Sequence, residues 1–188
     1  MTKSRFNRRR LFALPVRFAK HRGGLAAIEF AILLPAMLLL YLGAFELTQA
    51  IAIQRLVTMT ASTVANIVTQ YSSISESQTM PDILNSSATV LTPYSSSNAT
   101  VVVSAITVNA SGTATIAWSQ ALNGTARTVG QVVTLPAGLD VPNTTVIWGE
   151  TTYAYTPTID YMHLGTMNLY SSVYMLPRSS SGTITLTS

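Results

Sequence analysis

The stretch that organises this chain is residues 23–47, which read GGLAAIEFAILLPAMLLLYLGAFEL. No residue carries a charge between Phe30 and Phe45. A helix needs about 20 mainly apolar residues to span a bilayer, so we predict a transmembrane helix over residues 25–53. Glu29 is the unusual member of the stretch, because a carboxylate at the start of a membrane helix is costly unless a partner offsets its charge.

Two other residues of the apolar run have predicted roles. If the hydrocarbon begins near Leu25, Glu46 falls about 30 Å further along the helix, at the outer interface, where a carboxylate is tolerated. Pro35 removes one helical hydrogen bond and is expected to kink the span. A cleaved secretory signal is the weaker interpretation. Ala50-Ile51-Ala52 offers a small-x-small site, but the apolar run exceeds the roughly 7–15 residues typical of such signals.

The basic residues gather before the apolar run. Of the 11 Lys and Arg residues, eight precede Leu25, whereas all seven Asp and Glu residues follow it. The positive-inside rule then predicts a cytoplasmic leader over residues 1–24 and an exported remainder, and it explains the basic arm without nucleic acid. Gly23-Gly24 disfavours helix, so we expect a flexible spot there that a protease can fit. Cysteine is absent, which excludes disulfides and thiolate metal sites.

An apolar stripe predicts that the helix continues beyond the membrane as an amphipathic extension over residues 54–74. Gly and Pro are absent from Gln54 to Ser73. Apolar side chains recur there at three- and four-residue steps, at Leu56, Met59, Thr63, Ile67 and Tyr71, with Val64 and Val68 beside them. We expect the stripe to pack on the chain's own exported domain.

Residues 75–188 are expected to form an exported, β-rich head. The Ser75–Ser97 segment is typical of a loop, with a weak helical turn at Pro81–Leu84. Alternating apolar and polar residues predict strands at Thr100–Val108, Thr113–Ser119, Gln131–Leu135, Thr144–Thr156, Asn168–Leu176 and, at an edge, Thr183–Leu186. The predicted fold class is therefore α+β: a long N-terminal helix packed on a small, mostly antiparallel β-sheet.

Recognisable catalytic motifs are missing from the sequence, which contains no G-x-S-x-G, P-loop or H-E-x-x-H pattern. Asp160 and His163 lie three residues apart and would share a helix face, which suggests metal or acid–base chemistry. Tyr- and Thr-rich loops produce such pairs by chance. We therefore predict a protein that is not an enzyme and that uses neither a cofactor nor a metal. Trp118 and Trp148 are expected to be core or cross-strand residues.

The segment Gly24–Glu46 resembles the TadE/TadG-like family, the minor pilins (pseudopilins) of tight-adherence or Flp pili, a branch of type IV pili. The resemblance lies in the order of features: a glycine, a small-residue stretch, Glu29-Phe30, a short apolar run, Pro35, more apolar residues and the second acid Glu46. It implies cleavage by a prepilin peptidase between Gly24 and Leu25. A cut after Gly23 is the alternative; Gly24 is favoured because it makes Glu29 the fifth residue of the mature chain.

The resemblance further implies a single-pass protein of the bacterial inner membrane, with a cytoplasmic N-terminus and a periplasmic or extracellular head, that takes part in pilus assembly. The implied partners are the prepilin peptidase, other pilin or pseudopilin subunits and the Tad assembly machinery. Glu29 and Phe30 are then assembly residues, with Glu29 pairing with the new amino terminus of a neighbouring subunit. Alternatively, Glu29 only reaches toward the headgroups or the leader's arginines.

Two other functions compete with the pilus hypothesis. One is a permanently anchored periplasmic protein whose β-rich head binds a partner in the cell envelope. The other is a periplasmic hydrolase, for which Asp160 and His163 are the only support.

Overall fold

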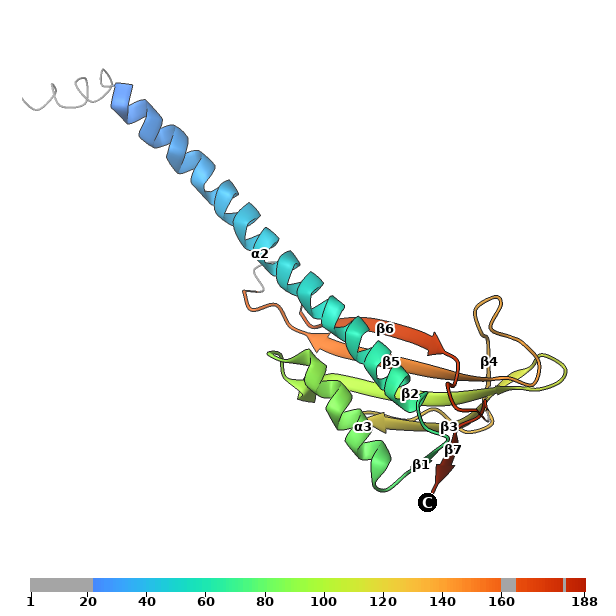
Figure 1. Ribbon diagram of the computed structural model, residues 1–188. Helices are drawn as coiled ribbons and strands as arrows, with labels where there is room; N and C mark the ends of the chain where they lie inside the picture. Colours follow the sequence, from blue (N-terminus) through green and yellow to red (C-terminus); the bar gives the residue numbers. More distant parts are fainter. Residues whose placement is uncertain (1–21, 160–164, 181) are drawn as a thin grey trace, which may run out of the picture. The chain divides into compact units, whose positions relative to one another are not determined.

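The computed structural model describes residues 22–159, 165–180 and 182–188 (Figure 1). The chain forms two compact units, Met1–Glu46 and Leu47–Ser188. Helix α2 runs from Arg22 to Val68 and contributes to both. Most of the predicted basic leader, together with the Asp160/His163 pair, lies outside the described residues.

Helix α2 begins earlier and ends earlier than the sequence suggested. Gly23 and Gly24 are helical, so the expected interruption at this pair is wrong. Glycine costs only about 0.5–1 kcal/mol relative to alanine in a helix, and the apolar residues that follow propagate the helix back through the pair. At the other end, the helix stops at Val68, and the N–H groups of Gln70 and Tyr71 donate to carbonyls three residues back.

The buried face of α2 is not centred on the predicted stripe. Met59 and Tyr71 are 56% and 38% exposed, so their assignment to the packed stripe is wrong. The fully buried positions in the head's part of α2 are Ile53, Val57, Thr60, Ala61, Val64, Ala65 and Val68. This face packs on the sheet, rather than the predicted stripe, because its small alanines let the helix approach the sheet closely. A Cβ atom on Gly149 of the sheet would lie only 2.5 Å from the carbonyl oxygen of Ala61.

Truncation of two α2 side chains, one half-buried and one exposed, tests which face of the helix packs on the sheet. Ile67 is half-buried against the main core cluster, whereas Met59 is exposed. We expect Ile67→Ala to lower the free energy of unfolding by about 1–3 kcal/mol, less than a fully buried truncation, and Met59→Ala to change it by less than about 0.5 kcal/mol. Thermal melts of the full chain in detergent measure both. Equal losses would mean that α2 packs on the sheet by another face.

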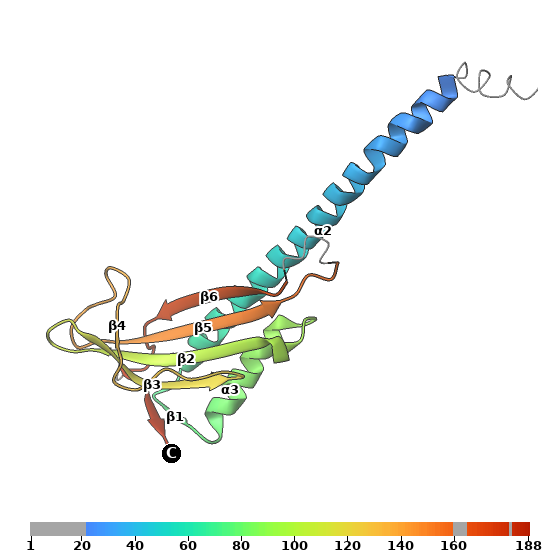
Figure 2. The same cartoon turned by 180° about the vertical axis from the view of Figure 1, so that it is seen from behind.

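The head contains a five-stranded antiparallel sheet in the order β4-β3-β2-β5-β6 (Figure 2). The strands are β2 (Ala99–Val108), β3 (Ala114–Leu122), β4 (Val132–Val133), β5 (Thr145–Tyr155) and β6 (Met167–Met175). Strands β1 (Ser73–Ser75) and β7 (Thr185–Thr187) form a separate parallel pair. The α+β class and the antiparallel sheet are confirmed, and each predicted strand corresponds to an observed one. The predicted place of Thr183–Leu186 at an edge of that sheet is wrong, because β7 pairs with β1 instead.

The segment predicted to be a loop contains a helix. α3 runs from Thr79 to Ala88 and is followed by the short 3₁₀ turns η2 (Thr89–Leu91) and η3 (Ser96–Asn98). The buried residues of α3 are Met80, Ile83, Leu84, Ser87 and Ala88, which share one helical face. Pro81 does not break the helix, because it lies in the first turn, where backbone N–H groups have no intrahelical partner.

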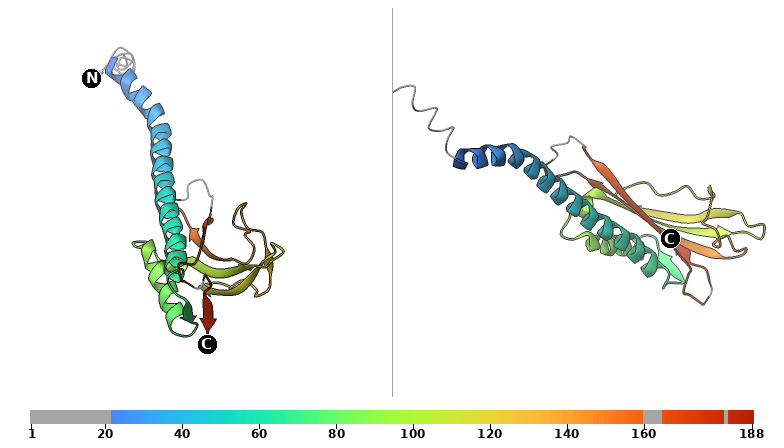
Figure 3. Two further views of the ribbon diagram at one scale, coloured as in Figure 1. Left: turned by 45° about the vertical axis from the view of Figure 1, so that its right-hand side comes forward. Right: turned by 90° about the horizontal axis from the view of Figure 1, so that it is seen from above.

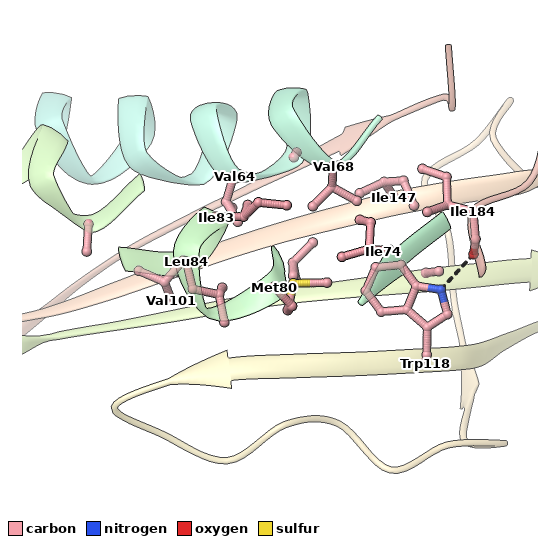
Figure 4. Packing of buried hydrophobic residues seen from close by; sticks show 14 residues of the cluster. Val64, Val68, Ile74, Met80, Ile83, Leu84, Val101, Trp118, Ile147 and Ile184 are labelled. Atoms are coloured by element: carbon pink, nitrogen blue, oxygen red, sulfur yellow. Dashed lines mark hydrogen bonds between the residues drawn. The ribbon is translucent and has the colours of Figure 1, made fainter. Parts of the chain in front are cut away.

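Helices α2 and α3 pack on the same face of the sheet. Val64 and Val68 of α2 meet Ile83 and Leu84 of α3 over β2 and β5 (Figure 4). Figure 3 shows α3 beside the C-terminal part of α2. Trp118 closes this core, and its Nε1 donates a 2.8 Å hydrogen bond to the carbonyl oxygen of Ile184. The prediction that Trp118 is a core residue is therefore confirmed.

Candidate functional site

The motif residues of the sequence all lie on the first unit's part of α2. Gly24, Leu25, Glu29, Phe30 and Pro35 follow one another on a single helix that continues without a break through the proline. From Gly24, α2 contains a stretch that is long and apolar enough to cross a membrane. None of its 18 most apolar residues is buried inside the protein. So many exposed apolar side chains need lipid or other apolar helices around them.

The two acids of the motif differ in surroundings. Glu29 is exposed on the described helix, among apolar neighbours such as Leu25 and Phe30, which are 62% and 59% exposed. Glu46 is half-buried at the end of the first unit. The structure holds no neighbouring subunit, so the assembly roles of Glu29 and Phe30, the cleavage site at Gly24-Leu25 and the kink at Pro35 stay predictions.

A charged cluster that sequence analysis missed lies on the sheet face opposite the helices. Arg127 donates from Nε to Glu150 Oε2 at 2.6 Å and from Nη2 to Glu150 Oε1 at 2.7 Å. Tyr170 also donates its hydroxyl to Glu150 Oε1, at 2.8 Å. The guanidinium of Arg127 lies 3.8 Å from the ring centre of Trp148, which stacks on Tyr174 with ring centres 5.4 Å apart. Trp148 is thus a cross-strand residue, as predicted.

Burial and pairing set the protonation behaviour of this cluster. The hydrogen bond to Glu150 raises the pKa of Arg127, so that guanidinium stays charged. Desolvation raises the pKa of both Tyr170 and Tyr174, which keeps the two phenols neutral at physiological pH. Only the strand alternation hinted that Glu150 shares a face with Trp148. Arg127 comes from an irregular segment, and nothing in its local sequence indicates this pairing.

The cluster borders a hollow of about 230 Å³, lined by Thr100, Val102, Thr125, Arg127, Glu150, Thr152 and Tyr170. Glu150 is 6% exposed and its carboxylate accepts three hydrogen bonds, so it is poorly placed to act as a base. Within the described residues, no group of three or more His, Cys, Asp or Glu side chains is arranged to hold a metal ion. The arrangement supports a structural ion pair rather than a reaction centre.

Removing one partner of this ion pair should destabilise the head. We expect Arg127→Ala to cost about 2–4 kcal/mol, because it leaves the buried Glu150 carboxylate without its cation. In the double variant Arg127→Ala/Glu150→Ala part of that loss should be recovered, since no unpaired charge remains. Chemical denaturation of the four proteins of this cycle measures the coupling. Strictly additive losses would show that the pair contributes no specific stabilisation.

The fold and the motif together define a class of protein: a single apolar helix that can anchor the chain in a membrane and that continues into an α+β head. Residues 24–66 match the family model described as TadE-like protein. This part of the chain is therefore similar to the TadE-like family, as the resemblance at Gly24–Glu46 suggested, and that family consists of pilus components. Neither the curated proteins nor the solved structures contain a match to this chain.

Proposed function

We propose that this chain is a minor pilin, or pseudopilin, that takes part in assembly of a Tad pilus after a prepilin peptidase removes its leader. One observation carries the proposal: the TadE-like match begins at Gly24, where the apolar part of α2 begins, and this helix leads into an α+β head. Assembly then exchanges lipid for the helices of neighbouring subunits, so the apolar residues of α2 stay covered throughout.

The packing of the head bears on where the membrane segment ends. Ile53 is 1% exposed and packs with Leu91 and Tyr153 in the head's core. Gln49 accepts a 2.8 Å hydrogen bond from the Tyr94 hydroxyl. Both residues are thus engaged by the head, so we place the membrane segment at Leu25–Glu46 rather than 25–53. These residues span roughly 33 Å as a helix, which matches a hydrocarbon core of about 30 Å.

The proposed orientation has a cytoplasmic N-terminus and an exported head, because eight basic residues precede Leu25. The proposed partners are the prepilin peptidase, other pilin subunits and the Tad machinery in the inner membrane. No cofactor and no catalytic role is part of the proposal. The motif match favours it over a permanently anchored protein whose head binds an envelope partner.

Deletion of the chain tests the proposal. We expect the deletion strain to lose its Tad pili, and the full-length chain supplied in trans to restore them, with pili counted by electron microscopy. A second reporter experiment tests the orientation: a fusion after Ser188 should be active only in the exported compartment. Normal piliation in the deletion strain, or a reporter active only in the cytoplasm, would contradict the proposal.

A further inference from the structure

The hollow beside the Arg127–Glu150 pair is lined mainly by polar side chains. Of the seven residues that line it, six carry a polar group in the side chain. Thr100 of β2, Thr152 of β5 and Tyr170 of β6 lie directly opposite one another on three adjacent strands (Figure 2). At about 230 Å³ the hollow is smaller than the roughly 300–1,000 Å³ of pockets that hold drug-sized ligands, so it has room for one small ring.

Several hydrogen-bonding groups around this hollow are not used by the protein itself. Two of the five N–H donors of the Arg127 guanidinium go to Glu150, and no described residue accepts the others. Among the described residues, the hydroxyls of Thr125 and Thr152 also have no partner. A hydroxyl can both donate and accept a hydrogen bond. The hollow therefore offers donors and acceptors to a ligand.

The charges at the hollow balance each other. Arg127 and Glu150 are the only charged residues among those described in its lining, and they form an ion pair. An anion near the guanidinium would also meet the carboxylate, and a cation near the carboxylate would also meet the guanidinium, so neither gains a net attraction. The phenol of Tyr170 adds no charge, because desolvation raises its pKa. These surroundings favour a neutral ligand.

The charged side of the hollow is held in place by the protein's own contacts. The ring of Trp148 supports one face of the Arg127 guanidinium, and two hydrogen bonds to Glu150 fix one edge of it. The hydroxyl of Tyr170 is held by the same carboxylate. Groups that are already ordered lose little conformational freedom when a ligand binds, and this favours binding.

The turn that carries Thr125 is fixed as well. Asn123 has a φ of +54°, and its Nδ2 donates to the carbonyl oxygens of Ser96 and Ala99 at 3.2 and 3.1 Å. The Thr100 hydroxyl donates to the carbonyl oxygen of Asn123 at 3.0 Å. These bonds tie the turn to the start of β2, and so place the hydroxyl-bearing Thr125 in the lining.

We infer that the hollow binds one neutral sugar ring. The hydroxyls of a sugar both donate and accept hydrogen bonds, which suits the available groups of Arg127, Thr125 and Thr152. The C–H faces of the ring are apolar and suit the aromatic ring of Tyr170, which is 50% exposed and also lines the hollow. The hollow belongs wholly to the unit Leu47–Ser188, so sugar binding is independent of pilus assembly.

Titration with matched sugars tests the class of ligand. The isotope-labelled full chain is held in a phosphocholine detergent, because glucoside and maltoside detergents would themselves offer sugars, and amide chemical shifts are followed by NMR at mildly acidic pH. Glucose and galactose are the neutral probes. Glucuronate and galacturonate carry a carboxylate on the same rings, and glucosamine and galactosamine carry an ammonium group.

We expect at least one neutral sugar to give saturable shifts at the residues that line the hollow. Its charged counterparts should bind at least about tenfold more weakly, because their charge loses hydration without gaining a net attraction. The absence of saturable shifts with both neutral sugars would overturn the inference. Tighter binding of a uronate or an amino sugar would also overturn it, since the site would then select charge.

Removal of two hydroxyls tests whether the hollow is the site. Thr125→Val and Thr152→Val keep the shape of the side chain and remove a hydroxyl that bonds no described part of the protein, so thermal melts should match those of the unaltered chain. We expect each change to weaken binding of the sugar about two- to tenfold, and the double variant at least about tenfold, because each loses one hydrogen bond to the ligand.

The matched control is Thr128→Val. Thr128 is exposed and follows Arg127 directly, but it does not line the hollow. This variant should bind the sugar like the unaltered chain. If the double variant Thr125→Val/Thr152→Val binds as tightly as Thr128→Val, the sugar does not occupy the hollow and the inference fails.

Discussion

Glu29→Gln should abolish piliation while the chain stays in the membrane. Cleavage after Gly24 makes Leu25 the new amino terminus, with a positive charge that can approach the Glu29 carboxylate of an adjacent subunit. In an apolar helical bundle an unpaired charge is expensive, and an ion pair is screened little. The glutamine variant keeps the shape and removes the charge, so insertion should persist while assembly fails. We expect pili per cell to fall at least about tenfold, because each 1.4 kcal/mol of lost pairing is a factor of ten in an equilibrium.

The matched control for this experiment is Glu46→Gln. Glu46 ends the proposed membrane segment at the outer interface, where a carboxylate is tolerated, so its neutralisation should affect piliation much less. Electron microscopy of both strains, with the variant proteins quantified in the membrane fraction, gives the comparison. Normal piliation with Glu29→Gln would refute the pairing.

Gly149→Val should have the largest effect on the head. Any Cβ at this position of β5 lies 2.5 Å from the carbonyl oxygen of Ala61 and 3.0 Å from the Cβ of Ala65. The first of these contacts is with helix backbone, so no side-chain rotation relieves it, and α2 would have to move off the sheet. We expect a loss of stability of more than about 3 kcal/mol, beyond the usual overpacking range, because the whole helix–sheet interface is displaced. Thermal unfolding of the full chain in detergent measures it.

Gly124→Ala is the control, because it also adds a Cβ atom to a glycine of the head. A Cβ at Gly124 would also be crowded, but by the Cγ2 and Oγ1 atoms of the Thr100 side chain, which can rotate away. We expect a loss of less than about 1.5 kcal/mol for this variant, since only a side chain must move. If Gly149→Val melted like Gly124→Ala, the close approach of α2 to β5 would not hold in solution.

Much of the architecture follows from patterns in the sequence. The long uncharged run after the basic leader predicts α2, and the alternating Thr, Val, Ile and Tyr residues predict β2, β3, β5 and β6, because strands and helices bury side chains at different periods. The motif from Gly24 to Glu46 also suggested the family that residues 24–66 match. These features are local, so a single sequence is enough to find them.

The errors have a different physical origin. The buried face of α2 depends on how closely Ala61 approaches Gly149, which is a contact between distant segments. Helix α3 was missed because its serines and its early proline conceal the apolar face of this ten-residue helix. The pairing of Arg127 with Glu150 joins an irregular segment to a strand and leaves no periodic signal. The position of β6 at one end of the sheet depends on the order of the strands, which local patterns do not determine.

The N-terminal sequence of the protein from the membrane fraction tests the pilus account most directly. In cells that contain a prepilin peptidase, we predict that the mature chain begins at Leu25, which leaves Glu29 as its fifth residue. In otherwise identical cells without the peptidase, the chain should keep residues 1–24. A leader that is retained in both strains would contradict the account.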